Sequence, residues 1–403
     1  MSKPRLCLAD GGVAAQLKAT NEFEIGLLIG QISPDKKSGR DLILTSVPTP
    51  PEEEDVKMIK LQDVSVEWMI AHAKQIFGWL PGGIDCVGMY IVSDEDPKAF
   101  VPKLQVHLNA LRSAKKQVHW LHSLDIKEEN VLYVVVRSPS RDLSAFFAPD
   151  ARSMPSPVEI QWQASPLDPL AKFTASIELH EIFASTSCGS VMTALTDRIG
   201  LHVAKVEEAL AIHGEDDGTV IFLTQPDDTL PPVDTPGVVQ VHGGISCVAY
   251  VASSTTPKKH VLARAAHYLK QDYLKSLSIR LDLIRDNLTT ETPTTLPLAR
   301  RAAFPWTSIA NHSTGFDGLL HLIPDDDLSH AYTNACELLT ASSRNGMAPA
   351  AVWIEAEAAS AAPVATEADG RALTHTSNGP PVSLFLCLAI LVVALVVHIF
   401  DLV

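Results

Sequence analysis

The apolar positions in the first part of the chain form short continuous runs separated by turn-forming residues. Phe23–Ser33 and Asp41–Val47 are two such runs, each suited to a strand buried on both faces. Between them, Pro34–Gly39 contains the proline, aspartate and glycine that favour turns. The two strands are therefore predicted to form a hairpin.

A helical spacing of apolar residues follows this hairpin. The N-cap is expected at Asp63 or Ser65, because both side chains can accept hydrogen bonds from the first helical turn. The helix is expected to end at Leu80–Gly83, where the sequence Leu-Pro-Gly-Gly contains two residue types that interrupt helices. The apolar positions at helical spacing are Val66, Met69, Ile70, Ala73, Ile76 and Phe77.

Three further elements complete the pattern of this half. Ile84–Val92 is an apolar run that predicts a strand, Pro97–His122 predicts a long helix, and Val131–Arg137 predicts another strand. The resulting β-β-α-β-α-β order is typical of a mixed α/β fold, in which helices pack against one sheet.

The second half repeats these elements with a weaker pattern. Either two α/β lobes with a break near Ser138–Pro166, or one continuous domain, is compatible with it. Strands are predicted over Val158–Gln163, Phe173–Phe183, Thr219–Leu223, Val238–Ala252 and Leu296–Arg301, and helices over Val191–Ile212, Pro257–Arg285 and Asp326–Thr340.

The periodicity ends near residue 340. Residues 341–381 are rich in alanine, serine, threonine, proline, glutamate and glycine, and Trp353 is their one aromatic residue. Such a composition buries too little apolar surface to offset chain entropy, so this segment is predicted to be a flexible linker. Whether the residues around Trp353 form a short helix is left open. Residues 1–340 are then the folded body.

The segment Val382–Phe400 is predicted to be a transmembrane helix. At 1.5 Å rise per residue it spans roughly 28 Å, which matches the apolar thickness of a bilayer. A buried core helix is the alternative, but such a helix normally carries a polar stripe. The apolar anchor residues are Val382, Leu384, Phe385, Leu386, Leu388, Ile390, Leu391, Val392, Val393, Leu395, Val396, Val397, Ile399 and Phe400.

This arrangement predicts a tail-anchored protein. The first ten residues lack the apolar run of a signal peptide, and only three residues follow the anchor. Insertion is therefore expected after translation, with the body in the cytosol. The anchor has few basic residues beside it, which favours the endoplasmic reticulum membrane over the mitochondrion. A removable lipid-anchor signal is not expected without a secretory signal.

Charge and cysteine content narrow the function classes. The net charge of −15 argues against nucleic acid as a partner and against anionic lipid as the means of attachment. The six cysteines are scattered and contain no Cys-x-x-Cys pair, so neither a disulfide framework nor a zinc ribbon is expected. A reducing compartment is the simplest interpretation.

Two local groups of residues are candidates for a reactive site. His119, His122 and Asp125 would share a helical face and could hold zinc if that helix continued, although Ser123 and Asp125 are typical of a helix end. Cys188, with His180 nearby in the sequence, could begin a Cys–His pair, but no basic neighbour is evident to lower its pKa. The motifs of serine hydrolases, P-loop proteins and dinucleotide-binding proteins are absent from the sequence. No catalytic residue, metal site or cofactor is predicted.

Several motifs follow one another along the chain in a recognisable order and spacing. They include Glu67-Trp68, His72-Ala73-x-Gln75, Gly243–Ser254 and the Pro257-Lys258-Lys259 start of a long helix. The principal motif residues are Gly26, Leu27, Leu28, Gly30, Gln31, Leu80, Pro81, Gly82 and Gly83. From about Glu24 to Phe304, this set resembles the odorant-response-abnormal protein four family in order and spacing. Arg300–Pro305 matches the corresponding family strand only loosely.

The resemblance implies a non-enzymatic membrane adaptor. It implies recruitment of the cysteine protease specific for the ubiquitin-fold modifier to the endoplasmic reticulum, assistance in the folding and trafficking of multi-spanning receptors, or both. It also implies a body like the MPN-type α/β fold without its metal. In agreement, no His-x-His pair, which an active MPN enzyme needs, occurs in the sequence.

The motif residues also have local structural explanations. Leu80–Gly83 can form a tight turn, and Gly26 and Gly30 within a strand indicate a bulge or the close approach of another backbone. A purely structural role for both motifs is favoured over direct contact with a partner. The alternative function is a membrane-anchored MPN-type or cysteine hydrolase whose site is unrecognised. A tail-anchored fusion protein would need a heptad-repeat helix leading into the membrane, which the sequence lacks.

Overall fold

The computed structural model describes the chain in segments that all fall within one compact unit, Met1–Ala358. The described residues are 6–33, 40–52, 58, 60–97, 101–118, 131–164, 170–184, 188–213, 218–223, 238–252, 260–287, 295–306, 315–322, 328–338 and 353–355.

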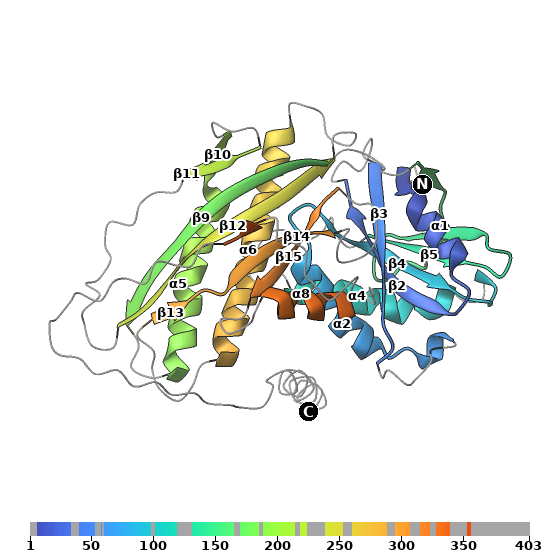
Figure 1. Cartoon of the computed structure of the whole chain (residues 1–403), viewed down its shortest axis with the longest axis horizontal. Helices are drawn as coiled ribbons and strands as arrows, with labels where there is room; N and C mark the ends of the chain where they lie inside the picture. Colours follow the sequence, from blue (N-terminus) through green and yellow to red (C-terminus); the bar gives the residue numbers. More distant parts are fainter. Residues whose placement is uncertain are drawn as a thin grey trace. The chain divides into compact units, whose positions relative to one another are not determined.

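The first part of this unit is built on an eight-stranded mixed sheet (Figure 1). The strand order is β7-β6-β5-β4-β2-β3-β1-β8, with β2 antiparallel to β3 and β4, and β1 parallel to β3 and β8. The strands are β1 (Leu6–Asp10), β2 (Glu24–Gln31), β3 (Arg40–Pro48), β4 (Asp85–Val92), β5 (Leu132–Arg137), β6 (Leu143–Ala148), β7 (Ser156–Pro157) and β8 (Ile160–Gln163). The central strands are almost wholly apolar because helices cover both faces of the sheet.

Two helices pack on one face of this sheet and one on the other. α2 (Val66–Trp79) and α4 (Gln105–Val118) share a core with one set of strand residues, whereas α1 (Gly11–Ala19) packs on the opposite set. Short 3-10 turns at Leu61–Asp63 and Val101–Leu104 precede α2 and α4. Ser65 is the N-cap of α2, and its hydroxyl accepts a hydrogen bond from the Trp68 amide at 3.2 Å, which confirms one of the two expected caps.

A second core forms around two long strands. β9 (Leu170–Ala184) and β12 (Val238–Ala252) pair antiparallel over their whole length, and β13 (Thr295–Pro297) adds to β12. The helices α5 (Cys188–Glu208) and α6 (Val261–Asn287) pack against these strands. Figure 1 shows β9 and β12 as two long curved ribbons side by side, next to these two helices.

Two small sheets complete the unit. β14 (Arg300–Pro305) lies between β15 (Asp317–Leu322) and β16 (Trp353–Ile354), and α8 (Leu328–Leu338) packs on β15 and shares the first core. β10 (Leu210–His213) and β11 (Val220–Leu223) form a separate antiparallel ribbon. The mixed α/β class predicted from the sequence is confirmed.

Most predicted elements are present, and three need correction. The helix predicted from Pro97 is interrupted: Pro97 is helical and residues 98–100 are not among those described, but Val101–Leu104 is a 3-10 turn and α4 begins at Gln105. The helix predicted to Ile212 ends at Glu208, because the alternating residues that follow form β10. The strand predicted over Leu296–Arg301 divides into β13 and β14, because Leu298 and Ala299 between them belong to neither strand. The elements without a counterpart in the prediction are β1, α1, β6, β7, β10, β15 and β16.

Part of the segment predicted as a linker belongs to the folded unit. Trp353 and Ile354 pair with Ala303 and Ala302 of β14, so these two residues form a strand. The remaining residues of 341–381 and the predicted anchor Val382–Phe400 lie outside the described residues. Within the described segments, no helix is both long and apolar enough to cross a bilayer.

Candidate functional site

The motif residues of β2 lie at the centre of the large sheet. Leu27 and Leu28 are fully buried on its two opposite faces. The pairing of β2 with β3 shifts register between Ile29 and Gly30, and a side chain at Gly30 would overlap the Leu42 carbonyl. A side chain at Gly26 would likewise overlap the Val47 carbonyl of β3. The bulge and close backbone approach expected from these glycines are therefore both present.

Leu80–Gly83 forms the turn between α2 and β4, and this turn pairs with β12. The Gly82 amide donates to the Val248 carbonyl at 2.8 Å, and the Tyr250 amide donates to the Gly82 carbonyl at 2.9 Å. Gly83 has a φ of 79°, a conformation that side chains rarely adopt. Leu80 is buried in the first core. The turn thus connects the two cores through backbone hydrogen bonds.

The side chain of Gln31 links β2 and the Leu80–Gly83 turn to β12. Its side-chain amide donates to the carbonyls of Gly83 at 2.8 Å and Tyr250 at 2.9 Å. Its side-chain oxygen accepts from the Ala252 amide at 3.1 Å. Gln31 is buried, so each of these bonds satisfies a backbone group that has little access to water.

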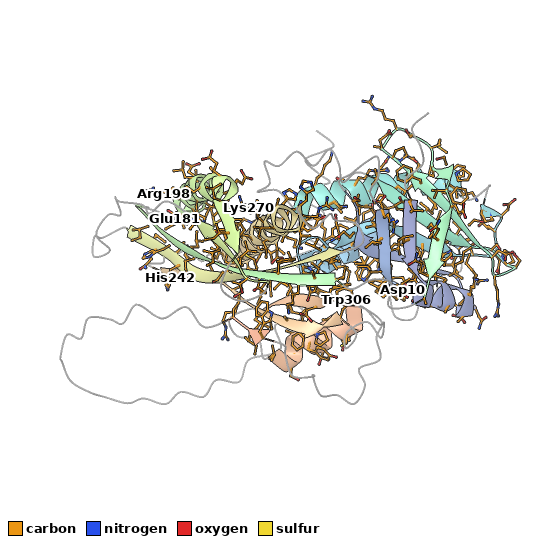
Figure 2. The ribbon with its side chains drawn as sticks, turned by 90° about the horizontal axis from the view of Figure 1, so that it is seen from above. Asp10, Glu181, Arg198, His242, Lys270 and Trp306 are labelled. Atoms are coloured by element: carbon orange, nitrogen blue, oxygen red, sulfur yellow. The ribbon has the colours of Figure 1, made fainter. Side chains whose placement is uncertain are left out.

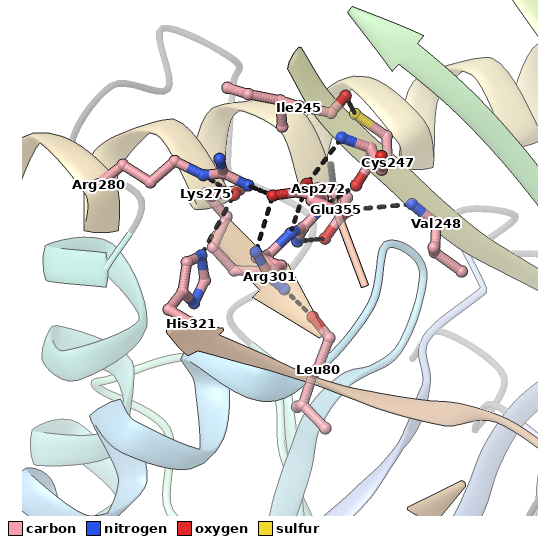
Figure 3. A network of polar contacts seen from close by, with 12 residues as sticks. Leu80, Ile245, Cys247, Val248, Asp272, Lys275, Arg280, Arg301, His321 and Glu355 are labelled. Carbon is pink, nitrogen blue, oxygen red and sulfur yellow. Dashed lines mark hydrogen bonds and ion pairs between the residues drawn. The ribbon is translucent and has the colours of Figure 1, made fainter. Parts of the chain in front are cut away.

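A buried ion pair also binds the backbone of β12, at Val248 and Ser246 (Figure 3). Arg301 of β14 donates to both carboxylate oxygens of Asp272 of α6, at 3.1 and 2.9 Å, and neither side chain is exposed. Asp272 also accepts from the Val248 amide at 2.9 Å. Arg301 donates as well to the Ser246 carbonyl. The pair therefore binds α6 and β14 to β12.

Glu355, directly after β16, extends this network. Its carboxylate pairs with Arg280 of α6 at 2.6 Å and accepts from the backbone amides of Arg301 at 2.7 Å and Ser246 at 2.8 Å. Lys275 of α6 donates to the Leu80 carbonyl in the α2–β4 turn. We call Asp272, Arg280, Arg301 and Glu355 the buried charge cluster; it comprises two cations and two anions.

The surroundings of the buried charge cluster perturb its titratable groups. Burial lowers the pKa of the Arg301 guanidinium, but the Asp272 and Glu355 carboxylates together raise it above its ordinary value. Burial lowers the pKa of Arg280 despite its contact with Glu355. His321 of β15, whose ring lies 3.2 Å from the Ser276 hydroxyl, has a pKa well below its usual value because of burial and three nearby cations.

The described cysteines are unsuited to nucleophilic chemistry. Burial raises the pKa of the Cys86 thiol to about 12 and also raises that of Cys247. Both side chains are inaccessible to solvent, as are those of Cys7 and Cys336. A protonated, buried thiol is neither a good nucleophile nor accessible to a substrate.

The structure describes only part of the two candidate reactive groups that the sequence indicates. His119, His122 and Asp125 lie outside the described residues. Cys188 begins α5, but its side chain is not described, while His180 contacts the Gln240 amide at 3.2 Å. Within the described residues, no three histidine, cysteine, aspartate or glutamate side chains form a group that could hold a metal ion.

The sequence did not identify the buried charge cluster. Asp272, Arg280 and Arg301 are buried, and a charge at a core-facing position of a helix or strand indicates a buried partner. Each has another charged residue within three positions, however, so the sequence does not distinguish it from a surface charge. Glu355 carried no such signal because its segment has the composition of a linker.

A comparison with protein families matches residues 26–216 and 219–343 to the model described as Odorant response abnormal 4-like. A protein odr-4 homolog of Gallus gallus is 40% identical over 75 residues, which cover 18% of this chain and 16% of that relative. The homolog of Xenopus laevis is 26% identical over 152 residues, covering 35% of this chain and 33% of that relative. The aligned stretches thus span a third or less of the relatives' own length.

Among solved structures, a UfSP from C. elegans aligns with 79% of this chain and 52% of its own. The sequence identity is 10% and the TM-score is 0.35. A likeness at this level does not support an assignment of fold or activity.

Proposed function

Because this chain belongs to the Odorant response abnormal 4-like family, we propose that it is a non-enzymatic adaptor in membrane protein trafficking. In this proposal the α/β body provides docking surfaces, and residues 382–400 hold it on the endoplasmic reticulum membrane with the body in the cytosol. Residues 1–340 form the body, to which Trp353–Glu355 are added as a strand and a buried anion. The other residues of 341–381 are the spacer.

The observation that carries this proposal is the burial of the family motifs. Gln31 and the Gly82–Gly83 turn use their polar groups within the protein, on β12. The adjacent charge cluster is also enclosed, with Asp272 and Arg301 fully buried. A catalytic centre needs polar groups that point into space open to a substrate. The motif residues instead connect the two cores of the body, which suits a protein that acts by presenting surfaces.

The proposed partners are the ubiquitin-fold-modifier-specific protease and multi-spanning membrane receptors. The body would gather the protease at the membrane, and the anchor would set its location. An MPN-like ancestry without metal chemistry is part of the same proposal. The second candidate is a membrane-anchored hydrolase of MPN or cysteine type. The buried thiols of Cys86 and Cys247 disfavour the cysteine type, and the absence of a His-x-His pair from the sequence disfavours the MPN type.

An affinity pull-down from native membranes tests the adaptor function. The full-length chain and a version ending at Pro381 are each purified by the same tag, with the tag alone as control. Recovery of the modifier protease with both versions is expected if the body carries the docking surface. If only membrane proteins are recovered, and only with the full-length chain, the protease-recruiting part of the proposal is wrong.

A further inference from the structure

The β10–β11 ribbon presents an uncovered apolar face. Leu210 pairs directly with Leu223, and Ile212 pairs with Ile221, so these four side chains lie on one face of the ribbon. They are 43–73% exposed. Half of the exposed large apolar side chains among the described residues are therefore gathered on eight strand residues. Scattered apolar side chains are usual on a protein surface, whereas a contiguous group marks an interaction site.

The opposite face of the ribbon is firmly attached to the body. Val220 is buried in the second core, and Phe222 packs against it. Lys270 of α6, labelled in Figure 2, donates to the carbonyls of Glu207 at 2.7 Å and Ala209 at 2.8 Å, at the junction of α5 with β10. Its ammonium also lies 5.5 Å from the centre of the Phe222 ring. The exposed face is thus a fixed surface of the body.

The charge of the surrounding sequence indicates what covers this face. From Glu207 to Gly237 the chain contains eight acidic residues and no lysine or arginine. A ribbon whose flanking sequence is this acidic repels anionic lipid, and a second copy of this chain would bring the same negative charges together. A basic partner is attracted by them.

We propose that the apolar face formed by Leu210, Ile212, Ile221 and Leu223 is a docking surface for a basic amphipathic segment of a partner protein. A strand of four residues spans about 13 Å. This length corresponds to about nine residues of α-helix. The occupant is therefore two to three helical turns, with an apolar stripe on the ribbon and lysine or arginine at its polar positions. This inference requires neither the membrane anchor nor the identity of the proposed partners.

Binding of two synthetic peptides to the full-length chain in phosphatidylcholine nanodiscs tests the inference. Both are about fourteen residues long, enough for a marginal isolated helix. Both place leucine at helical spacing; one has lysine at the polar positions and the other glutamate. Fluorescence anisotropy is measured at about 0.05 M and about 0.5 M NaCl, since the higher salt screens all but the closest charges.

The matched variants change only the exposed surface. L210T/I212T/I221T/L223T removes the apolar face while keeping residues that favour strands. L210T/L223T is a milder version in case the fourfold variant does not fold. V106T and M154T remove exposed apolar side chains elsewhere and serve as controls.

The lysine peptide is expected to bind the wild-type chain and both controls, at least tenfold more tightly than the glutamate peptide, and to weaken at high salt. The ribbon variants should bind it at least tenfold more weakly. The inference is overturned if the lysine peptide does not bind, if both peptides bind equally, or if the ribbon variants bind like wild type. It is also overturned if sedimentation shows that the wild-type chain is a dimer and that the ribbon variants are monomers. The same holds if the Met1–Pro381 chain floats with neutral vesicles and its ribbon variants do not.

Discussion

The guanidinium of Arg301 and the carboxylate of Asp272 form a two-pronged ion pair, at 3.1 and 2.9 Å, with both side chains fully buried. The two residues belong to different parts of the chain, β14 and α6, and both also bind the backbone of β12. Since the family turn at Gly82 binds the same strand from the first core, β12 is the element on which the body is assembled.

Removal of Asp272 should destabilise the body strongly. Asp272→Ala leaves the Arg301 charge without its main partner and is expected to cost about 3–5 kcal/mol of unfolding free energy. Asp272→Asn, which keeps an acceptor for the Val248 amide, should cost less. Urea unfolding measures both. Glu95→Ala, which breaks an exposed pair with Lys103, is the control and should cost about 1 kcal/mol or less. Equal costs for Asp272→Ala and the control would refute the role of the buried pair.

Replacing two different glycines by alanine should change the free energy of unfolding in opposite directions. Gly83→Ala places a side chain at a φ of 79° and against the Tyr250 carbonyl, which should cost at least about 2 kcal/mol. Gly200→Ala lies in α5 with open space around it and should stabilise the protein by about 0.5–1 kcal/mol. Thermal and urea unfolding of the two variants provide the comparison. A neutral Gly83→Ala would contradict the strained turn described above.

The stability of the body should fall in mild acid, in part through His321. Its folded pKa is well below the ordinary value because of burial and the nearby Arg301, Arg280 and Lys275 cations. The unfolded chain therefore binds a proton that the folded chain does not as the pH falls below about 6.5. Each such proton adds a slope of up to about 1.4 kcal/mol per pH unit. His321→Gln should reduce the slope of unfolding free energy between about pH 6.5 and 5. An unchanged slope would show that His321 protonates freely in the folded protein.

Alkylation tests the cysteine hydrolase alternative. Because burial keeps Cys86 and Cys247 protonated and covered, iodoacetamide should modify them at neutral pH only after unfolding. Mass spectrometry of the native and urea-unfolded protein resolves the individual sites. Rapid modification of Cys247 in the native protein would instead indicate an accessible, reactive thiol.

Local patterns were enough to predict much of the fold. The hairpin of β2 and β3, the cap of α2 at Ser65, and the bounds of β12 all follow from apolar runs, capping residues and turn residues in the sequence. These features depend on neighbouring residues and on the period of side-chain burial.

The features that were missed depend on contacts distant in sequence. Trp353–Glu355 lies in a stretch with the composition of a linker, yet it is held by β14, Arg280 and Ser246. β10 resembles the end of α5 until its pairing with β11 is known. The role of Gln31 also becomes clear only when Gly83 and Ala252 are seen beside it. Tertiary pairing decides such segments, and composition does not reveal it.

Vesicle flotation with purified components tests the central claim most directly. The full-length chain is reconstituted into phosphatidylcholine vesicles and mixed with the purified ubiquitin-fold-modifier protease. Empty vesicles and the Met1–Pro381 chain are the controls. The account predicts that the protease floats only with vesicles carrying the full-length chain. A protease that remains at the bottom of the gradient under every condition would contradict the proposal that this body recruits it to a membrane.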